Sequence, residues 1–244
     1  KNILLCVSGG ISAYKAIDLA SRLCKQGFEV KCVLSENATK FVSPLNFSAI
    51  THNSVHTSLF TDADPIPHIT LATWADLLIV APVTANILAK AANGIADDLL
   101  STILVAYDKP VLFVPAMNVK MYHSAIVQEN IERLLQRGHY ILQPATGKLA
   151  CGTEGEGKYP PNEEIIYAIQ TYLNYTLDLK GIKVLINAGA TVEAIDPMRF
   201  LSNRSSGKMG LAIARALALR GAEVTLLYGN LQVELPYNIQ DKVF

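Results

Sequence analysis

The first residues that suggest chemistry lie in the turn SGGIS at positions 8–12, which places two glycines and two serines directly after an apolar run. Residues 2–8 predict a buried strand, and apolar residues at helical spacing begin at Ala13. Backbone N–H groups and the positive end of the helix dipole can face an anion at such a junction. The turn therefore predicts a phosphate or flavin site. A merely tight turn explains the same residues, since the dinucleotide fingerprint GxGxxG is absent.

Polar residues also stand where two further predicted strands end. Thr84 and Asn86 follow the apolar run 76–82, and Ser35 closes the run EVKCVLS at 29–35. Open α/β sheets bind ligands at the carboxyl ends of their strands, so these residues are candidates for ligand contact. The alternative role is helix N-capping, which Thr and Asn fill well and which can coexist with ligand contact.

Two residues could act on a substrate. His68, in PIPHITLATWAD, carries an imidazole, a group that suits proton transfer, although a structural histidine is the alternative. Asn118, in PAMNVKMY at 115–122, could hold a carboxylate by amide donors without adding charge. That neutrality matters for decarboxylation, because a strong cation would hold the charge on the carboxylate instead of releasing its electrons to an adjacent sink.

Of the four cysteines, Cys6 and Cys32 lie in strand-like runs and Cys24 in a helical pattern, which predicts three buried thiols. None of the four has CxxC or metal-ligand spacing, so we expect no metal site. Cys151 differs, because the segment TGKLACGTEGEGK predicts a mobile surface loop and an accessible thiol through its glycines at 147, 152, 155 and 157.

The elements that must position these residues follow a strand, glycine turn, helix, strand order, which predicts a right-handed βαβ unit. The apolar runs 76–82 and 109–116 suit strands that are covered on both faces. We therefore predict a flavodoxin/Rossmann-like, doubly wound parallel sheet. Helices are expected at 38–50, 85–93, 97–107, 124–137 and 162–174.

The same pattern restarts at GIKVLINAGA, near residue 181, and predicts the beginning of a second doubly wound α/β domain. The polar connection 174–181 is the expected boundary, which gives domains at 1–176 and 181–244. The second segment is short for a doubly wound domain, so we expect it to be truncated.

The charge balance of 21 basic and 21 acidic residues gives no support to a nucleic-acid or membrane surface. Small molecules or copies of the chain are the expected partners. No run of about 18 apolar residues is present, and the start KNILLCVSGG lacks the zones of a signal peptide. These features predict a cytoplasmic protein.

Five segments together resemble the motif set of the homo-oligomeric flavin-containing cysteine decarboxylases in order and spacing. They are SGGISAYK at 8–15, His68 within HITL, APVTAN at 81–86, PAMNVKMY at 115–122 and ACG at 150–152. The resemblance spans roughly residues 1–175 and is nearest to members that act on 4'-phosphopantothenoylcysteine in coenzyme A synthesis. It implies FMN as the cofactor, held by Gly9, Gly10, Ile11, Ser12, Ser35, Thr84, Asn86 and Ala116.

The resemblance also implies the reaction. Oxidation of the substrate cysteine produces a thioaldehyde-like electron sink that lets carbon dioxide leave, and reduction of the resulting enethiol gives 4'-phosphopantetheine. In that reaction His68 is the acid/base, Asn118 holds the carboxylate, and Cys151 closes over the substrate and donates a proton in the reductive step. Tyr122 departs from the family, whose asparagine motif more often ends in tryptophan. The family forms trimers, or dodecamers built from trimers, with active sites at subunit contacts.

Residues 187–214 resemble the opening signature of phosphopantothenate–cysteine ligase, which is fused to the decarboxylase in many bacteria. The likeness implies a role for Asn203 at the acyl-cytidylate step, and Ser205 to Lys208 form a polar helix start suited to phosphate. A full-length parent is expected to use CTP and Mg²⁺, whereas we expect no complete ligase activity from this chain.

Other interpretations stay open. The chain could be a flavoprotein that acts on peptidyl cysteine or an FMN-binding prenyltransferase of similar fold, although the ligase-like segment favours the coenzyme A pathway. It could also be an FMN-binding regulatory subunit without chemistry, an interpretation that loss of His68 or Cys151 would favour. If the chain were a doubly wound protein of another family, the order and spacing of the five motifs would be a coincidence.

Overall fold

The computed structural model describes residues 1–60, 65–148, 152, 154–174, 178–229 and 240–243. The chain forms two compact units, Lys1–Ile169 and Gln170–Phe244, and each is described by itself. This division falls inside a helix, Asn162–Asn174 (α9), a few residues before the expected boundary. The domain limits 1–176 and 181–244 remain a prediction. Among the residues described, no helix is both long and apolar enough to cross a membrane.

The first unit alternates strands and helices along the chain. Its strands are Asn2–Val7 (β1), Glu29–Leu34 (β2), Val55–His56 (β3), Leu77–Val83 (β4), Val111–Pro115 (β5), Tyr140–Ile141 (β6), Ala145–Lys148 (β7) and Glu154–Lys158 (β8). Its helices are Ala13–Lys25 (α1), Glu36–Thr39 (α2), Pro44–Thr51 (α3), Pro67–Trp74 (α4), Ala85–Asn93 (α5), Leu99–Ala106 (α6), Val119–Tyr122 (α7), Ala125–Gln136 (α8) and α9.

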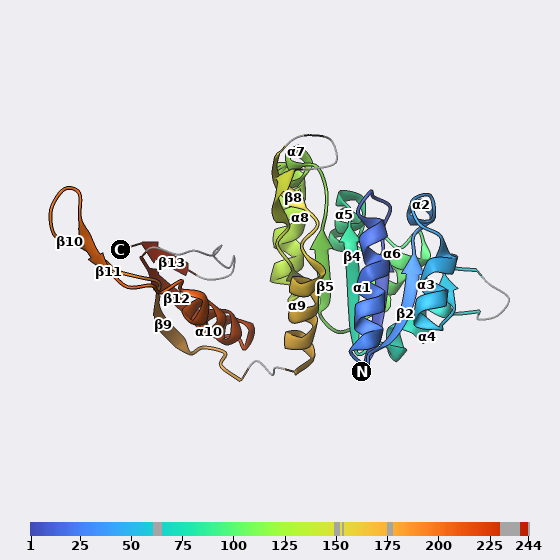
Figure 1. Ribbon diagram of the computed structural model, residues 1–244. Helices are drawn as coiled ribbons and strands as arrows, with labels where there is room; N and C mark the ends of the chain where they lie inside the picture. The colour runs from blue at the N-terminus through green and yellow to red at the C-terminus, as the bar shows by residue number, and fades with distance from the viewer. Residues whose placement is uncertain (61–64, 149–151, 153, 175–177, 230–239, 244) are drawn as a thin grey trace. The chain divides into compact units, whose positions relative to one another are not determined.

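Six of these strands form one parallel sheet in the order β3-β2-β1-β4-β5-β6 (Figure 1). The chain winds outward from β1 in one direction and then from β4 in the other, which confirms the predicted Rossmann-like fold. The neighbours β1 and β4 therefore mark the topological switch point, where α/β sheets of this kind bind their ligands.

Helices cover both faces of this sheet, which explains why its strands are apolar almost throughout. In Figure 1, α1 and α3 lie in front of the sheet. On the opposite face, α4, α5, α6 and α8 pack on alternate strand residues such as Leu4, Leu78 and Phe113, which are buried in one core cluster. Both faces of the sheet are thus buried, and its polar residues lie at the ends of the strands.

Two expectations about local structure are wrong. The helix expected at 38–50 is two helices, because Ser43 caps a new helix that has Pro44 at its first position, and proline disfavours helical backbone in the residue before it. The segments on either side of Cys151, which were expected to belong to a mobile loop, are the strands β7 and β8 of an antiparallel hairpin, and Cys151 itself lies outside the described residues. Glycines 147, 155 and 157 lie within its strands and not in a loop.

The second unit contains the strands Lys183–Ala188 (β9), Val192–Ala194 (β10), Phe200–Ser202 (β11), Glu223–Tyr228 (β12) and Gln240–Val243 (β13), and one helix, Lys208–Leu219 (α10). Strands β13, β12 and β9 form a parallel sheet, and β10 pairs with β11 in a hairpin. The side chains of Leu211 and Ala214 on α10 pack on Val224 and Leu226 of β12. A second βαβ arrangement therefore begins here, as predicted.

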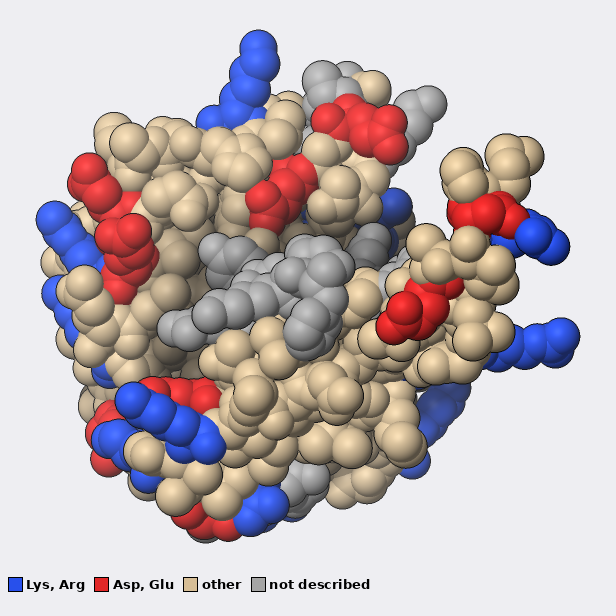
Figure 2. Space-filling model, turned by 90° about the vertical axis from the view of Figure 1, so that its left-hand side faces the viewer, with Lys and Arg blue, Asp and Glu red and all other residues tan. Residues whose placement is uncertain are grey.

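Figure 2 shows basic and acidic side chains interspersed on the face that it displays, with uncharged surface between them. Neither sign gathers into a broad patch among the residues coloured there. The view agrees with the balanced charge of the sequence.

Candidate active site

The carboxyl ends of four neighbouring strands are tied together at the switch point. The Ser8 hydroxyl donates to the Pro82 carbonyl at 2.9 Å and accepts from the Thr84 N–H at 2.9 Å, which joins the ends of β1 and β4. The Ala116 N–H donates to the Val83 carbonyl at 3.2 Å, and the Ser35 N–H to the Val7 carbonyl at 3.0 Å. The residues that follow β1, β2, β4 and β5 therefore form one continuous edge, as the sequence predicts.

The turn after β1 offers unpaired donors at this edge. Within the described residues, the backbone N–H groups of Gly9, Gly10, Ile11 and Ser12 have no hydrogen-bond acceptor, and the first helical N–H, that of Ala13, donates to the Gly10 carbonyl at 2.9 Å. Ser12 caps α1 without a side-chain hydrogen bond. Four consecutive donors at a helix start suit a phosphate group, so this turn fits the phosphate of a flavin nucleotide.

The glycines of the turn have different tasks. A Cβ on Gly9 would lie 2.4 Å from the Cβ of Asn37, so Gly9 permits α2 to pack directly on the turn. A Cβ on Gly10 would meet only the Cγ2 of Thr84, at 3.7 Å, which is an ordinary contact. Gly9 is thus required by packing, whereas Gly10 keeps the turn accessible beside Thr84.

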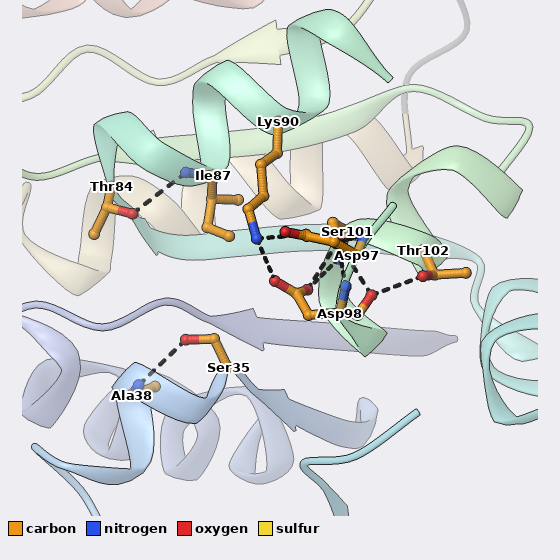
Figure 3. Close-up of polar contacts among 9 residues, drawn as sticks. All are labelled: Ser35, Ala38, Thr84, Ile87, Lys90, Asp97, Asp98, Ser101 and Thr102. Carbon is orange, nitrogen blue, oxygen red and sulfur yellow. Dashed lines mark hydrogen bonds and ion pairs between the residues drawn. The ribbon is translucent and has the colours of Figure 1, made fainter. Parts of the chain in front are cut away.

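Thr84 is a helix N-cap, as the alternative interpretation proposed, whereas Asn86 is not, and Ser35 is also an N-cap (Figure 3). The Ser35 hydroxyl accepts from the Ala38 N–H at 3.2 Å, and the Thr84 hydroxyl accepts from the Ile87 N–H at 3.5 Å. Asn86 lies exposed in the first turn of α5. Both helices therefore begin at the edge. Contact of these side chains with FMN remains a prediction.

Asn118 lies at the same edge and caps α7, because its Oδ1 accepts from the Lys120 N–H at 2.9 Å. With the oxygen engaged, the Nδ2 group is the donor of this side chain. Strand β8 lies directly against the segment, since the Met117 N–H donates to the Gly157 carbonyl at 2.9 Å. A Cβ on Gly157 would lie 2.3 Å from the Met117 oxygen, so only glycine permits this approach.

Cys151 lies outside the described residues, between the two strands of the hairpin that contacts the Asn118 segment. The other three cysteines are free. Burial raises the pKa of the Cys6 and Cys32 thiols far above their ordinary values, so both stay protonated. Cys24 is only half-buried, contrary to expectation, because it lies near the solvent-facing side of α1. None of these three provides a thiolate.

His68 lies in the first turn of α4, which packs on α6. Its Nδ1 is buried and has no hydrogen-bond partner in the part of the chain that is described. No hydrogen bond or ion pair among those residues joins it to the glycine turn or to Asn118. Hydrogen bonds thus link the segments that follow β1, β2, β4 and β5, whereas the buried Nδ1 of His68 takes part in none of these bonds.

An ion-pair network on α5, the helix that Thr84 caps, was not predicted from the sequence. The Lys90 ammonium, on α5, contacts Asp97 at 2.5 Å and Asp98 at 2.7 Å (Figure 3). Asp98 caps α6 through the Ser101 N–H at 2.8 Å and forms a reciprocal capping box with Ser101. The network joins the helix that begins at the edge to its neighbour. The spacing of Asp98 and Ser101, three residues apart, was the available signal.

In the second unit, Asn203 is exposed, and its Oδ1 accepts from the Ser205 N–H at 2.9 Å. Gly207 precedes α10 with a φ of 77°, a conformation that favours glycine. The polar helix start expected at Ser205 to Lys208 is therefore present in the structure. The role of Asn203 remains a prediction.

A parallel sheet of order 3-2-1-4-5-6 with a turn of unpaired N–H groups at its switch point is typical of the doubly wound nucleotide-binding class. The family model "Flavoprotein" matches residues 1–174, and the chain belongs to this family. A second model, "DNA/pantothenate metabolism flavoprotein C-terminal domain", matches residues 179–243.

Two curated relatives match almost the whole chain. It is similar to the coenzyme A biosynthesis bifunctional protein CoaBC of Bacillus subtilis, with 46% identity over 245 residues, 99% of this chain and 60% of the relative. The Haemophilus influenzae protein of the same name is 45% identical over 98% of this chain and 60% of its own length. The chain thus spans about 60% of the length of these relatives.

Solved structures resemble the first part of the chain. A mutant PPC decarboxylase complexed with pantothenoylaminoethenethiol has a TM-score of 0.64 and 29% identity, over 70% of this chain and 97% of that one. The FMN-dependent cysteine decarboxylase SpaF has a TM-score of 0.61 and 30% identity, over 70% of this chain and 94% of its own.

Proposed function

We propose that the first unit catalyses FMN-dependent decarboxylation of 4'-phosphopantothenoylcysteine to 4'-phosphopantetheine. The observation that carries the proposal is the row of four unpaired N–H groups at 9–12, placed at the switch point of a flavoprotein fold. The PPC decarboxylase structure and the CoaBC relatives favour this substrate over peptidyl cysteine.

FMN, when bound, supplies a two-electron acceptor and donor next to the substrate thiol. The turn 9–12 would hold its phosphate, and Ser35, Thr84, Asn86 and Ala116 would line it along the edge. The neutral Asn118 amide would hold the carboxylate without stabilising its charge enough to oppose loss of carbon dioxide. His68 would exchange a proton with the substrate, and Cys151 would donate one in the reductive step.

A homo-oligomer, a trimer or a dodecamer of trimers, completes the proposal. The buried Nδ1 of His68 has no hydrogen-bond partner within the described part of one chain, and we propose that subunit contacts complete the surroundings of this group. A fully active monomer in analytical ultracentrifugation would contradict it.

We also propose a cytoplasmic location, and a parent protein whose second domain ligates cysteine with CTP and Mg²⁺ through Asn203.

The test is anaerobic incubation of the purified protein with 4'-phosphopantothenoylcysteine, with flavin absorbance and carbon dioxide release recorded. We expect carbon dioxide release, with 4'-phosphopantetheine formed by the unmodified protein and not by the Cys151→Ser variant. Bound flavin without turnover in either protein would contradict the decarboxylase and favour a regulatory flavin-binding subunit.

A further inference from the structure

Helix α7 has four residues, which is too few for a helix to be stable without outside support. Strand β8 supports the beginning of this helix. The Met117 N–H donates to the Gly157 carbonyl at 2.9 Å. A Cβ on Gly155 would lie 2.9 Å from the Cγ2 of Val119, so a side chain at position 155 would displace Val119. Two alternate residues of β8 therefore hold the beginning of α7 through close backbone contact.

The residue between these glycines, Glu156, contacts the end of the helix. Its Oε2 lies 3.3 Å from the Nε2 of His123, which caps the C-terminus of α7. Its other oxygen, Oε1, accepts from the Nε2 of Gln143. Gln143 is held near the sheet, because the N–H of its neighbour Leu142 donates to the Phe113 carbonyl of β5 at 2.8 Å. One carboxylate therefore connects the end of α7 to the segment that follows β6.

The position of α7 determines the direction of the Asn118 amide. The Asn118 Oδ1 accepts from the Lys120 N–H at 2.9 Å. The Asn118 carbonyl accepts from the N–H groups of Met121 and Tyr122, at 3.0 and 2.9 Å. The side chain and the main chain of Asn118 are thus both bound to the helix, so a shift of the helix turns the amide. Tyr122 is 5% exposed and packs in the core, so loss of the His123 contact would reorient α7 without detaching it.

We infer that Glu156 is a positioning residue: by holding His123, it keeps α7 and the Asn118 amide in the orientation that receives the substrate carboxylate. This assignment rests on the proposed decarboxylase function, in which Asn118 binds that carboxylate. Glu156 does not bind the substrate carboxylate itself, because like charges repel and both of its oxygens have partners. Its effect on the substrate must therefore pass through Asn118.

The test is a double-mutant cycle on the flavin-loaded protein. In Glu156→Ala, the KM for 4'-phosphopantothenoylcysteine should rise about tenfold, as expected when a hydrogen bond to a charged group is weakened. The kcat should change by less than about twofold, because the carboxylate that the amide binds is lost in the reaction itself. In an Asn118→Ala background, Glu156→Ala should raise KM no further. Glu156→Gln should restore most of the affinity, since its amide oxygen can accept from His123.

Inhibition by the product 4'-phosphopantetheine, which lacks the carboxylate, separates positioning from general damage to the site. Its inhibition constant should be the same in Glu156→Ala and in the unmodified protein. Glu154→Ala is the matched control, because Glu154 is an exposed carboxylate on the same strand, and it should leave KM unchanged. Rises in KM that add in the double variant would overturn the inference, as would an equal weakening of product binding in Glu156→Ala.

Hydrogen exchange separates failure of the inference from failure of the proposed function. Exchange of the amides of residues 119–123, measured by mass spectrometry, should be severalfold faster in Glu156→Ala than in Glu154→Ala or the unmodified protein. Unchanged exchange would overturn the inference even if the protein is an active decarboxylase. If the unmodified protein releases no carbon dioxide, the proposed function fails and the role toward the substrate fails with it, whereas faster exchange would still show that Glu156 holds α7.

Discussion

At the residue scale, the candidate site depends on one close approach. Gly9 lets α2 pack against the turn that follows β1, and a methyl group there would overlap both the side chain and the backbone of Asn37. The neighbouring Gly10 has no such contact, although the sequence shows the two as an equivalent pair. Their different surroundings make them a matched test of packing at the turn.

We expect Gly9→Ala to lower the free energy of unfolding by about 1–3 kcal/mol, because the turn or α2 must move to relieve the overlap. Gly10→Ala should change it by no more than about 0.5 kcal/mol. Urea unfolding of the flavin-free variants would measure both. Equal losses would show that the Asn37 contact does not distinguish the two glycines.

His139 makes stability depend on pH. Its Nδ1 accepts from the Val111 N–H at 3.2 Å, and burial, together with the charge of Arg137, lowers its pKa from the ordinary value of 6.5. The unfolded chain therefore binds a proton more readily than the folded one, so this contribution is complete above pH 6.5 and is lost as the pH falls through the folded pKa. Unfolding measured from pH 7.5 downward should show a shallower decline in His139→Asn.

At the element scale, helices α5 and α6 are joined by the network of Lys90, Asp97, Asp98 and Ser101. Helix α5 begins at Thr84 in the candidate site and carries Lys90 farther along. A shift of α6 would therefore also move α5, which begins at the sheet edge.

Substitutions of Asp98 should separate the contribution of its N-cap to stability from that of its ion pair with Lys90. Asp98→Ala loses both the N-cap and one partner of Lys90, and we expect a loss of about 1–2 kcal/mol in the free energy of unfolding. Asp98→Asn should lose less, because asparagine caps helices as well as aspartate does. If Asn and Ala destabilise the protein equally in urea unfolding, the ion pair and not the cap is the main contribution.

The hairpin of β7 and β8 offers a test of how the Cys151 region is positioned. A side chain at Gly157 would push against the Met117 carbonyl and would need a φ near 128°, which L-residues rarely adopt. We expect Gly157→Ala to lower kcat by roughly ten- to a hundredfold while FMN content is kept. Glu154→Ala, exposed on the same strand, is the control. Normal turnover in Gly157→Ala would mean that hairpin placement does not limit the reaction.

Local patterns predicted the regular elements well and the tertiary contacts poorly. The helix at 85–93 was predicted at its observed limits, because its apolar spacing and the preceding Thr84 agree. The expected helix at 38–50 failed although Ser43-Pro44 is a readable start signal. The glycines at 155 and 157 were assigned to a loop, because their role depends on Met117 and Val119, which are distant in the sequence.

For the candidate site, the sequence predicted that these residues lie at the sheet edge, but it did not predict their hydrogen-bond partners. Strand ends are readable from apolar runs, so Ser35 and Thr84 were expected at the edge. The hydrogen bonds of Ser8 to Pro82 and Thr84 were not, because they depend on the pairing of β1 with β4.

At the scale of the whole molecule, the first unit should function without the second. Helix α9 completes it, since Ile165, Ile166 and Ile169 are buried. A protein ending at residue 174 should therefore fold, bind FMN and keep its decarboxylase activity. One ending at residue 161 loses three buried isoleucines, each contributing about 1.5–3 kcal/mol, and should not accumulate as folded protein. Circular dichroism and flavin absorbance of the two would decide, and activity lost in the longer form would contradict the independence of the first unit.

The pairing of β1 with β4 has a consequence for synthesis of the chain. The partner of Ile3 is Leu77, so β1 leaves the ribosome more than seventy residues before its second neighbour exists. Until then one edge of β1 has no partner strand, and Thr84, which lies beside the turn at 9–12 in the folded protein, has not been synthesised. The flavin site proposed at this edge is incomplete at that stage, and the open edge of β1 can pair with other chains until β4 forms.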